Sequence, residues 1–449
     1  MPFSSTNFLF ILPVLVAVYW LLPRNWRRFW LVVSSLVVYM AAGWRDLFLL
    51  WAVTAANWAS YRVWPESRRV RHAMIAFNLL VLMWFKYRYF IADNVGYTFA
   101  TRESLIIPLG LSFYIFQLIS YQVEILQGLI PKSPSFLSFL LYIFFFPHHQ
   151  SGPIMRPHLF LRYFREGRPW RLPRFQMGLL IMLWGLFKKI WIADFLLAGS
   201  MNALYRALET SHGAQGNVLL LAVGYGIQIY ADFSGYSDIA VGLGRMFGFR
   251  LDRNFHQPYI TAGPSEFWRR WHVTLSSWLR DFLYIPLGGN RKGEARTLAN
   301  LLIVMLLGGL WHGAAWTFVV WGFLHGLYLV IEKVGAPLLE RVRTFKYLLF
   351  QFLFMLSWLP FRASRFGDIV ALVRRYDAWV SPETVLALVL FAAIIGFSYM
   401  EDYLERHFIA IFRKVLAVPD FVLAPAFGAA LYLLLVGVKY ESMFIYQRF

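Results

Sequence analysis

The chain has 449 residues, of which 59% are hydrophobic, 15% are charged and none is cysteine. Since a soluble globular protein carries about 25% charged residues, this composition excludes an ordinary soluble enzyme, and the lack of cysteine excludes disulfides, cysteine metal sites and cysteine nucleophiles. The formal net charge of +19 does not indicate a nucleic-acid partner, because the basic residues are spread over connectors and form no soluble basic domain.

Apolar windows recur along the whole sequence, and many approach the roughly 20 residues that a helix needs to cross a bilayer. They lie at 7–22, 29–43, 46–62, 72–90, 105–126, 136–147, 176–198, 216–231, 298–310, 313–332, 346–360, 384–400 and 421–438. Some are too short to cross alone, so we predict an all-α integral membrane protein with about 11 transmembrane helices plus re-entrant and amphipathic helices. No soluble domain or strong internal repeat interrupts the pattern, so we expect residues 1–449 to form a single membrane domain.

Basic residues are concentrated in the connectors at 24–28, 62–71, 156–174 and 245–296. The positive-inside rule places these connectors on the cytoplasmic side. The N-terminus and the connectors near 43–46, 91–104 and 199–215 are then expected outside. The first window lacks a preceding basic region and a small-residue cleavage site, so we expect it to remain as a membrane anchor.

The stretch 264–282, PSEFWRRWHVTLSSWLRDF, belongs to the least lipid-like part of the chain. Pro264 or Ser265 is a suitable helix start, and aromatic residues recur at helical spacing opposite the arginines. This pattern predicts one amphipathic helix at the membrane surface or at the protein edge. His272 lies within it, either as an interfacial side chain with a polar tip or as part of a site.

The apolar run 297–331 is about twice as long as one span needs, and it contains GGLWHG. Gly308, Gly309 and Gly313 predict a break between two helical segments. Non-helical backbone at membrane depth survives only where protein or water covers it, so His312 is expected to line a cavity or tunnel. Its usual pKa near 6.5 suits a general base, whereas the alternative is a packed histidine bonded by backbone.

Other titratable residues have simpler interpretations beside a functional one. Asp232 and Asp238 of DFSGYSD are acids at or near a membrane segment, and either function, or helix capping and charge pairing at the bilayer rim, explains them. Adjacent histidines point in different directions, so His148 and His149 do not predict a metal clamp. His325 fits a packing role. The two lysines at 188–189 fit snorkelling or an internal acid partner.

Several enzyme signatures are absent from the sequence. It contains no G-x-S-x-G elbow, no H-E-x-x-H motif and no Walker A loop. The sequence therefore gives no support to a serine hydrolase, a zinc protease or a P-loop ATPase, and we expect no metal site.

Three blocks resemble the membrane-bound O-acyltransferase family, and especially its bacterial alginate O-acetyltransferase branch. They are DFSGYSDIAVGLGRMFGF at 232–249, EFWRRWHVTLSSWLRDFLYIPLGGNRKG at 266–293 and LLGGLWHGAAWTFVVWGFLHG at 306–326. IPLGLSFYIFQLISYQVE at 107–124 and SGPIMRP at 151–157 are also similar, which puts the expected catalytic region at about 105–330. HHQS in FPHHQSGPIMRP departs from this branch, and an SGPI pattern also occurs in the related teichoic acid D-alanyl transferases.

The resemblance implies a many-helix fold with a funnel and a tunnel through the membrane. It implies that His312 of the WHG motif and His272 of the RRWH motif are the catalytic residues, with His312 as the base and His272 orienting the thioester or a polar group beside it. Candidates for contact with substrate or for the tunnel lining are Asp232, Ser234, Asp238, Trp268, Trp311, Asn290 and Ser151. The resemblance implies no bound cofactor. The acyl donor would be acetyl-CoA or a carrier-protein thioester on the cytoplasmic side.

The same resemblance implies a bacterial inner-membrane protein whose acceptor is a hydroxyl of an extracytoplasmic polysaccharide. The acyl group would reach it directly or through a partner acetyltransferase- or esterase-like protein. D-alanyl transfer to teichoic acid or a similar polymer stays open, as does transfer to a lipid or a protein. In a non-enzymatic transporter, His312 would be a gate or proton site, but the absence of a strong repeat argues against this class.

Overall fold

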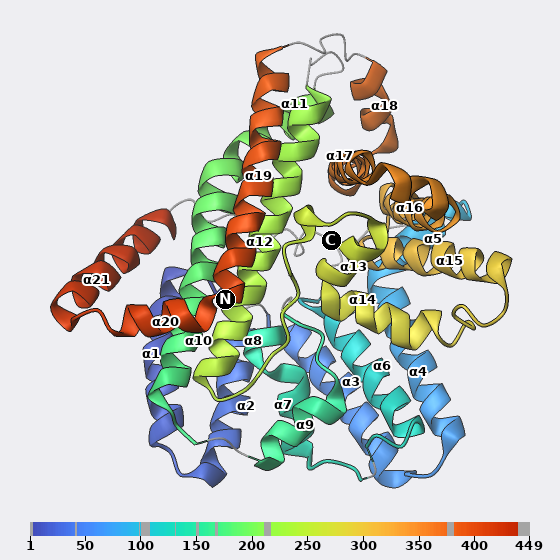
Figure 1. The fold of residues 1–449 in the computed structure, drawn as a ribbon. Helices are drawn as coiled ribbons and strands as arrows, with labels where there is room; N and C mark the ends of the chain where they lie inside the picture. The colour runs from blue at the N-terminus through green and yellow to red at the C-terminus, as the bar shows by residue number, and fades with distance from the viewer. Residues whose placement is uncertain are drawn as a thin grey trace. The chain divides into compact units, whose positions relative to one another are not determined.

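A computed structural model describes residues 3–40, 43–97, 99, 108–130, 132–149, 152–166, 169–210, 217–374 and 381–438. Within these ranges all regular secondary structure is helical (Figure 1). This confirms the predicted all-α fold, which follows from the composition because a chain in lipid must satisfy its own backbone hydrogen bonds. The contacts divide the chain into two compact units, Met1–Gly185 with Tyr236–Asp252, and Leu186–Gly235 with Arg253–Phe449. The division into two units does not test the single membrane domain expected from the sequence, which stays a prediction.

The first unit begins with long helices joined by short connectors. Its elements are α1 (Thr6–Leu21), α2 (Arg24–Met40), α3 (Trp44–Val63), α4 (Arg68–Leu82), η1 (Met83–Tyr87), α5 (Arg88–Asn94), α6 (Leu111–Leu126), α7 (Phe136–Phe144), α8 (Phe146–His149), α9 (Pro157–Glu166) and most of α10 (Leu172–Leu186). Helix α2 packs against α7, α4 packs against α6, and α9 packs against both α6 and α7.

A buried polar cluster joins three of these helices. Arg71 of α4 is only 1% exposed, and its guanidinium donates to Gln122 Oε1 of α6 over 2.9 Å and to the carbonyl of Ser60 in α3. Asn57 and Asn78 exchange amide hydrogen bonds of 2.9 Å beside it. Buried polar groups are tolerated when they are bonded to one another, so this cluster fixes how α3, α4 and α6 pack.

The second unit contains the long C-terminal helices. Its elements are η2 (Phe187–Ala198), α11 (Gly199–Thr210), the start of α12 (Val218–Met246), η3 (Pro258–Ile260), α13 (Pro264–Arg270), α14 (Val273–Leu279), η4 (Arg280–Tyr284), α15 (Glu294–His312), α16 (Trp316–Leu339), η5 (Glu340–Val342), α17 (Arg343–Arg362), α18 (Phe366–Arg374), α19 (Pro382–Arg406), α20 (Phe408–Leu416) and α21 (Asp420–Gly437). Helix α16 packs against α15 on one side and α17 on another.

Over the described residues, every apolar window is largely helical, and the window 136–147 is divided between α7 and α8 at Phe145. Among the described residues, six helices are long and apolar enough to cross a membrane, and three apolar helices are shorter. The chain is therefore a multi-pass membrane protein. Side chains such as Leu80 and Leu388, which are 62% and 59% exposed, suit contact with lipid. In α12, by contrast, 94% of the apolar window is buried within protein.

Candidate active site

His312 is the last residue of α15, and the chain turns at Gly313 before α16 begins at Trp316. The sequence predicted a break at Gly308 and Gly309 as well, but both glycines are helical, so that part of the prediction is wrong. The reason is close packing. A Cβ at Gly309 would overlap the Phe318 carbonyl oxygen, so the absent side chain lets α15 and α16 approach closely.

Aromatic rings surround the His312 imidazole. Its centroid lies 5.0 Å from Trp311, 5.0 Å from Trp321 and 5.2 Å from Phe361, and each ring meets it edge-on. The His312 side chain is 3% exposed. It is therefore enclosed by protein and shielded from lipid. The tunnel expected beside it stays a prediction.

The second histidine lies at a break that the sequence did not predict. Helix α13 ends at Arg270 and α14 begins at Val273, so the single helix expected over 264–282 is wrong, although its start at Pro264 is confirmed. His272 adopts the left-handed conformation, with φ 43° and ψ 52°. For a residue with a side chain this conformation is strained, by about 1–2 kcal/mol.

Backbone pairing with a preceding segment explains the break. The Val273 N–H donates to the Asn254 carbonyl over 2.9 Å, and the Arg270 carbonyl accepts from the His256 N–H over 3.0 Å. Both groups would bond within the helix if 264–282 were continuous. A helix cannot be predicted to break here from its own residues, because the partner segment lies outside it.

The Asn254 side chain fixes the orientation of the His272 ring. Asn254 Oδ1 accepts from the backbone N–H and the hydroxyl of Thr274, at 3.2 Å and 2.6 Å, which identifies this atom as the oxygen. His272 Nδ1 lies 3.3 Å from the same oxygen, so Nδ1 carries the proton and Nε2 the lone pair. The side chain is fully buried, and this burial lowers the pKa of His272 to about 3. His272 is therefore neutral at physiological pH.

Both histidines contact one indole. The Trp311 ring lies 6.0 Å from the His272 ring and 5.0 Å from the His312 ring, between centroids. Phe233 of α12 meets the His272 ring edge-on, with 4.6 Å between the two centroids. The structure thus brings together His272, Trp311 and His312, three of the residues that the sequence singled out.

The acidic candidates lie inside α12, which continues past the predicted window 216–231 to Met246. Asp232 is 1% exposed and pairs with Lys189, with 2.6 Å between Oδ1 and Nζ. This matches the charge-pairing alternative, and a substrate contact for Asp232 stays a prediction. Ser234 is buried on the same helix in the second unit, whereas Asp238 belongs to the first unit.

An internal acid partner was one of the two alternatives for the lysines at 188–189, but the sequence did not identify which acids pair with them. Lys188 Nζ lies 3.0 Å from Glu401 Oε1 of α19, and the Tyr230 hydroxyl donates to the other oxygen of Glu401. Lys189 Nζ lies 3.0 Å from Asp194 Oδ1. An internal acid partner, rather than snorkelling, therefore holds each lysine. Glu401 follows the window 384–400 directly, so an acid beside an apolar run was the available signal.

The remaining candidates for substrate contact or tunnel lining are Trp268, Asn290 and Ser151. Trp268 meets Trp321 and His325 edge-on at 5.8 Å and 5.1 Å, so it joins the aromatic cluster near His312. Asn290 is exposed in the turn after η4, where it accepts from Tyr284, and no contact in the described part of the chain links it to the histidines. Ser151 lies outside the described residues.

Two other histidines have simple structural partners. His325 is fully buried, and its Nε2 lies 3.0 Å from Ser357 Oγ, as expected for a packing role. His148 Nδ1 lies 3.0 Å from Gln117 Nε2. Over the residues that the structure describes, no group of three histidine, aspartate or glutamate side chains could hold a metal ion.

The chain matches the sequence model of the membrane-bound O-acyltransferase family over residues 21–359. It is 39% identical over 386 residues to a probable alginate O-acetylase of Azotobacter vinelandii, covering 81% of this chain and 75% of that relative. It is 31% identical over 390 residues to a peptidoglycan O-acetyltransferase of Helicobacter pylori, covering 77% and 73%. It is 26% identical over 354 residues to a teichoic acid D-alanyltransferase of Bacillus subtilis, covering 73% and 87%.

Proposed function

Since the chain belongs to the membrane-bound O-acyltransferase family and is an O-acyltransferase, we propose that it moves an acetyl group onto an extracytoplasmic polysaccharide. Two of the relatives above are named as O-acetyl-transferring proteins, of alginate and of peptidoglycan. The D-alanyltransferase is less similar, at 26% identity. Acetyl is therefore the favoured group, and D-alanyl transfer is the second candidate.

The burial of His312 among aromatic rings is the observation that carries the mechanism. His312 takes the proton from the acceptor hydroxyl as its oxygen bonds to the acyl carbon. The carbon–sulfur bond of the thioester then breaks, and His312 returns the proton to the departing thiolate. Transfer from a thioester to a hydroxyl is thus balanced, giving an ester and a thiol. The rings of Trp311, Trp321 and Phe361 exclude water, which would otherwise hydrolyse the thioester.

The turn between α15 and α16 supplies complementary electrostatics. His312 is at the carbonyl end of α15, where the helix dipole stabilises the positive charge that the imidazole gains. Helix α16 begins four residues later, at Trp316, and the N–H groups of a first helical turn are suited to a developing negative charge. We assign the oxyanion of the tetrahedral intermediate to this turn, because donors directed at it would stabilise the transition state.

His272 acts as a positioning residue in this proposal. Its pKa of about 3 makes it a poor base for a hydroxyl, and its Nδ1 is engaged with Asn254. Its contact with Trp311, 6.0 Å between centroids, lets it hold the indole that also touches His312. A ring held in this way keeps the catalytic imidazole within the narrow range of productive geometries.

The donor is a coenzyme A or carrier-protein thioester on the cytoplasmic side of a bacterial inner membrane. The N-terminus then lies outside, and the basic connectors at 24–28, 62–71 and 156–174 face the donor. Positive potential at this surface would attract the phosphates of either donor. On the other side, the acceptor is the polysaccharide itself or a partner acetyltransferase- or esterase-like protein that relays the group.

Ester-linked acetate on the surface polysaccharide tests this function. Cells would carry the wild-type protein, His312→Ala or the control His325→Gln, which alters a buried packing histidine, all at matched membrane levels. We expect His312→Ala to lower the rate of acetylation by about 10²-fold to 10⁴-fold, the usual contribution of a general base. D-alanyl esters measured on the same samples decide the second candidate. Undiminished acetate in His312→Ala would refute the role of His312.

A further inference from the structure

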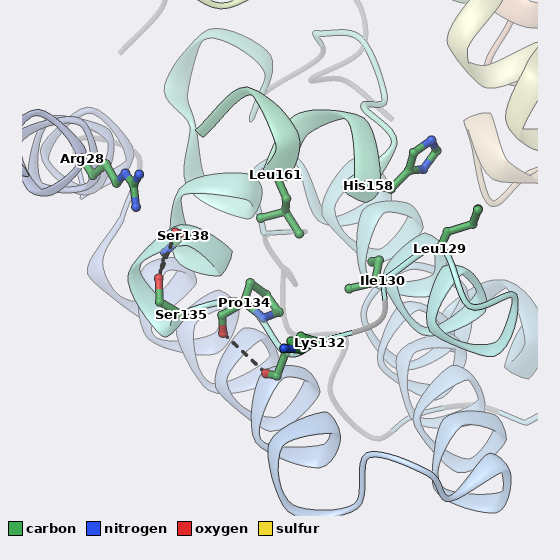
Figure 2. Close-up of a pocket in the computed structure, with 10 residues that line it drawn as sticks. Arg28, Leu129, Ile130, Lys132, Pro134, Ser135, Ser138, His158 and Leu161 are labelled. Atoms are coloured by element: carbon green, nitrogen blue, oxygen red, sulfur yellow. Dashed lines mark hydrogen bonds between the residues drawn. The ribbon is translucent and has the colours of Figure 1, made fainter. Parts of the chain in front are cut away.

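A pocket of about 550 Å³ lies within the first unit, and none of the candidate site residues lines it. Figure 2 shows it between the start of α2, the connector from α6 to α7, and α9. Its polar lining comes from two cations, three hydroxyls and one imidazole: Arg28, Lys132, Ser133, Ser135, Ser138 and His158. Arg28 and His158 belong to the basic connectors proposed to face the donor, but none of the lining residues was assigned to the chemistry at His312, so the pocket needs a separate explanation.

Two residues of the pocket wall, Ile130 and Pro134, are hydrogen-bonded to α3. The Tyr61 hydroxyl donates to the Ile130 carbonyl over 2.7 Å, and the Trp58 indole donates to the Pro134 carbonyl over 2.8 Å. Ser135 caps α7, because its Oγ accepts from the Ser138 N–H. These bonds fix Ile130, Pro134 and Ser135, so a ligand would not need to order these parts of the wall on binding.

Positive charge dominates this pocket. Arg28 is half-buried and Lys132 is exposed, and the first turn of α7 adds the positive end of a helix dipole. The nearby acid, Glu124, is 2% exposed and is covered by His158, whose Nδ1 lies 3.0 Å from Glu124 Oε2. The His158 N–H also donates to this carboxylate over 2.9 Å. The acid is thus occupied by its own partner and is screened from the pocket.

Hydroxyl and cationic donors around one cavity suit a phosphate group. A phosphate offers several strong acceptor oxygens, and arginine, lysine and serine are donors that bind it well. The Ser135 hydroxyl donates to Ser138 Oγ over 2.9 Å, which leaves the Ser138 hydroxyl as the one that could donate to an anion. A carboxylate would use fewer of these donors.

The rest of the lining is apolar. It consists of Leu129, Ile130, Pro134 and Leu161, and Leu129 is 48% exposed. Figure 1 shows the connectors from α1 to α2 and from α3 to α4 at the same end of the first unit as α9. This end carries the basic residues at 24–28 and 62–71, so under the orientation proposed above it faces the cytoplasm. Apolar side chains beside phosphate donors at that level match the headgroup and the first carbons of a phospholipid.

We propose that this pocket binds a phosphate-bearing ligand, with the headgroup of an anionic phospholipid as the source that its apolar wall favours. A soluble phosphate compound shares the same chemistry and is the second source. The site adds lipid recognition to the protein and does not depend on the acyl group or the acceptor of the proposed function. Its failure and that of the transferase proposal are distinguishable, because ligand binding is measured without turnover.

Native mass spectrometry of the full-length protein in neutral detergent tests the proposal. The probes are phosphatidylglycerol, phosphatidylcholine of the same acyl chains, and inorganic pyrophosphate. We expect the wild type to prefer phosphatidylglycerol to phosphatidylcholine. Arg28→Gln/Lys132→Gln should weaken phosphatidylglycerol binding by about tenfold, as for the loss of charge-assisted hydrogen bonds. Lys132→Gln alone changes an exposed side chain and should give a smaller loss in the same direction.

The matched control is Arg68→Gln/Arg69→Gln, which removes two exposed charges at the same end of the first unit, outside the pocket. It should leave binding within about twofold of the wild type, since screened surface charges contribute little. Pyrophosphate binding that is lost in Arg28→Gln/Lys132→Gln, without a lipid preference, would support the soluble source. Equal losses in the two double variants would overturn the proposal, and so would a wild type that neither prefers phosphatidylglycerol nor binds pyrophosphate.

Discussion

Lys189 and Asp232 form an ion pair with 2.6 Å between Nζ and Oδ1, and both side chains are 2% exposed. The same ammonium lies 3.0 Å from Asp194, whose side chain is 1% exposed. Lys189 therefore pairs with two buried carboxylates. Removing Lys189 affects both acids, whereas removing one acid leaves Lys189 paired with the other. This asymmetry predicts different costs for removing the cation and removing one acid.

Lys189→Met should be the more damaging change, because it leaves Asp194 and Asp232 buried without their shared cation. Breaking a buried ion pair by removing one partner costs about 3–5 kcal/mol. Asp232→Asn should cost less, since Lys189 retains Asp194. Thermal unfolding of the detergent-purified variants measures this order. An Asp232→Asn protein that is as stable as the wild type yet inactive would instead give Asp232 a direct role with substrate.

Gly309→Ala should increase the distance between α15 and α16 and weaken their packing. The added Cβ would overlap the backbone oxygen of Phe318, and backbone cannot move aside as a flexible side chain can. We expect a loss of about 1–3 kcal/mol, as for other overpacked contacts, together with reduced activity because His312 ends the same helix. Thermal unfolding and acetylation of the same preparations measure both effects.

Gly396→Ala is the matched control for that change. It lies within α19, and a Cβ there meets nothing within 4 Å. An alanine in an open helical position should be neutral or stabilising by about 0.5–1 kcal/mol. If Gly309→Ala behaved like Gly396→Ala, close packing would not explain the glycine at 309.

The helices were predictable because the membrane leaves few choices for an apolar chain. A window such as 384–400 can satisfy its backbone in lipid only as a helix, and it is helical in α19. The WHG and RRWH motifs likewise identified His312 and His272, which the structure places against one tryptophan. The helices follow from local sequence, whereas the grouping of the two histidines was implied by the family resemblance.

The predictions that failed depend on contacts between residues that are distant in sequence. The break at His272 depends on Asn254, 18 residues earlier, and the Lys188–Glu401 pair joins residues 213 positions apart. Gly309 resembles a helix breaker in isolation, and only the neighbouring Phe318 shows why the glycine is needed. No periodicity within a segment encodes such contacts, so they could not be predicted from one sequence.

His272 should make the fold less stable as the pH falls. Its pKa is about 3 in the folded protein, below the usual 6.5, so between these values the unfolded chain binds more protons. Stability is unaffected above pH 6.5 and declines as the pH falls from 6.5 towards 3. The loss between pH 7 and pH 5 should be about 2 kcal/mol.

His272→Asn isolates this contribution. Asparagine tolerates the left-handed conformation better than most residues, so the variant should fold, although it loses the imidazole contacts. The difference in Tm between pH 7 and pH 5 should be smaller in His272→Asn than in the wild type. Equal differences in the two proteins would mean that His272 is not held neutral by burial.

Trp311 should control the rate of transfer through its position. Its indole is 4% exposed and touches both histidine rings. Trp311→Ala would leave a large cavity and cost about 3–5 kcal/mol, so Trp311→Phe, which keeps an aromatic ring, is the informative variant. A smaller ring lets the His312 imidazole move, and a displacement near 1 Å can lower a rate by about 10²-fold.

We therefore expect kcat of Trp311→Phe per folded molecule to fall by at least about tenfold. KM for the donor should change little, because the indole holds the base and not the thioester. Steady-state kinetics on protein quantified by its folded fraction measures both constants. A normal kcat with a lowered folded fraction would show that Trp311 only fills space.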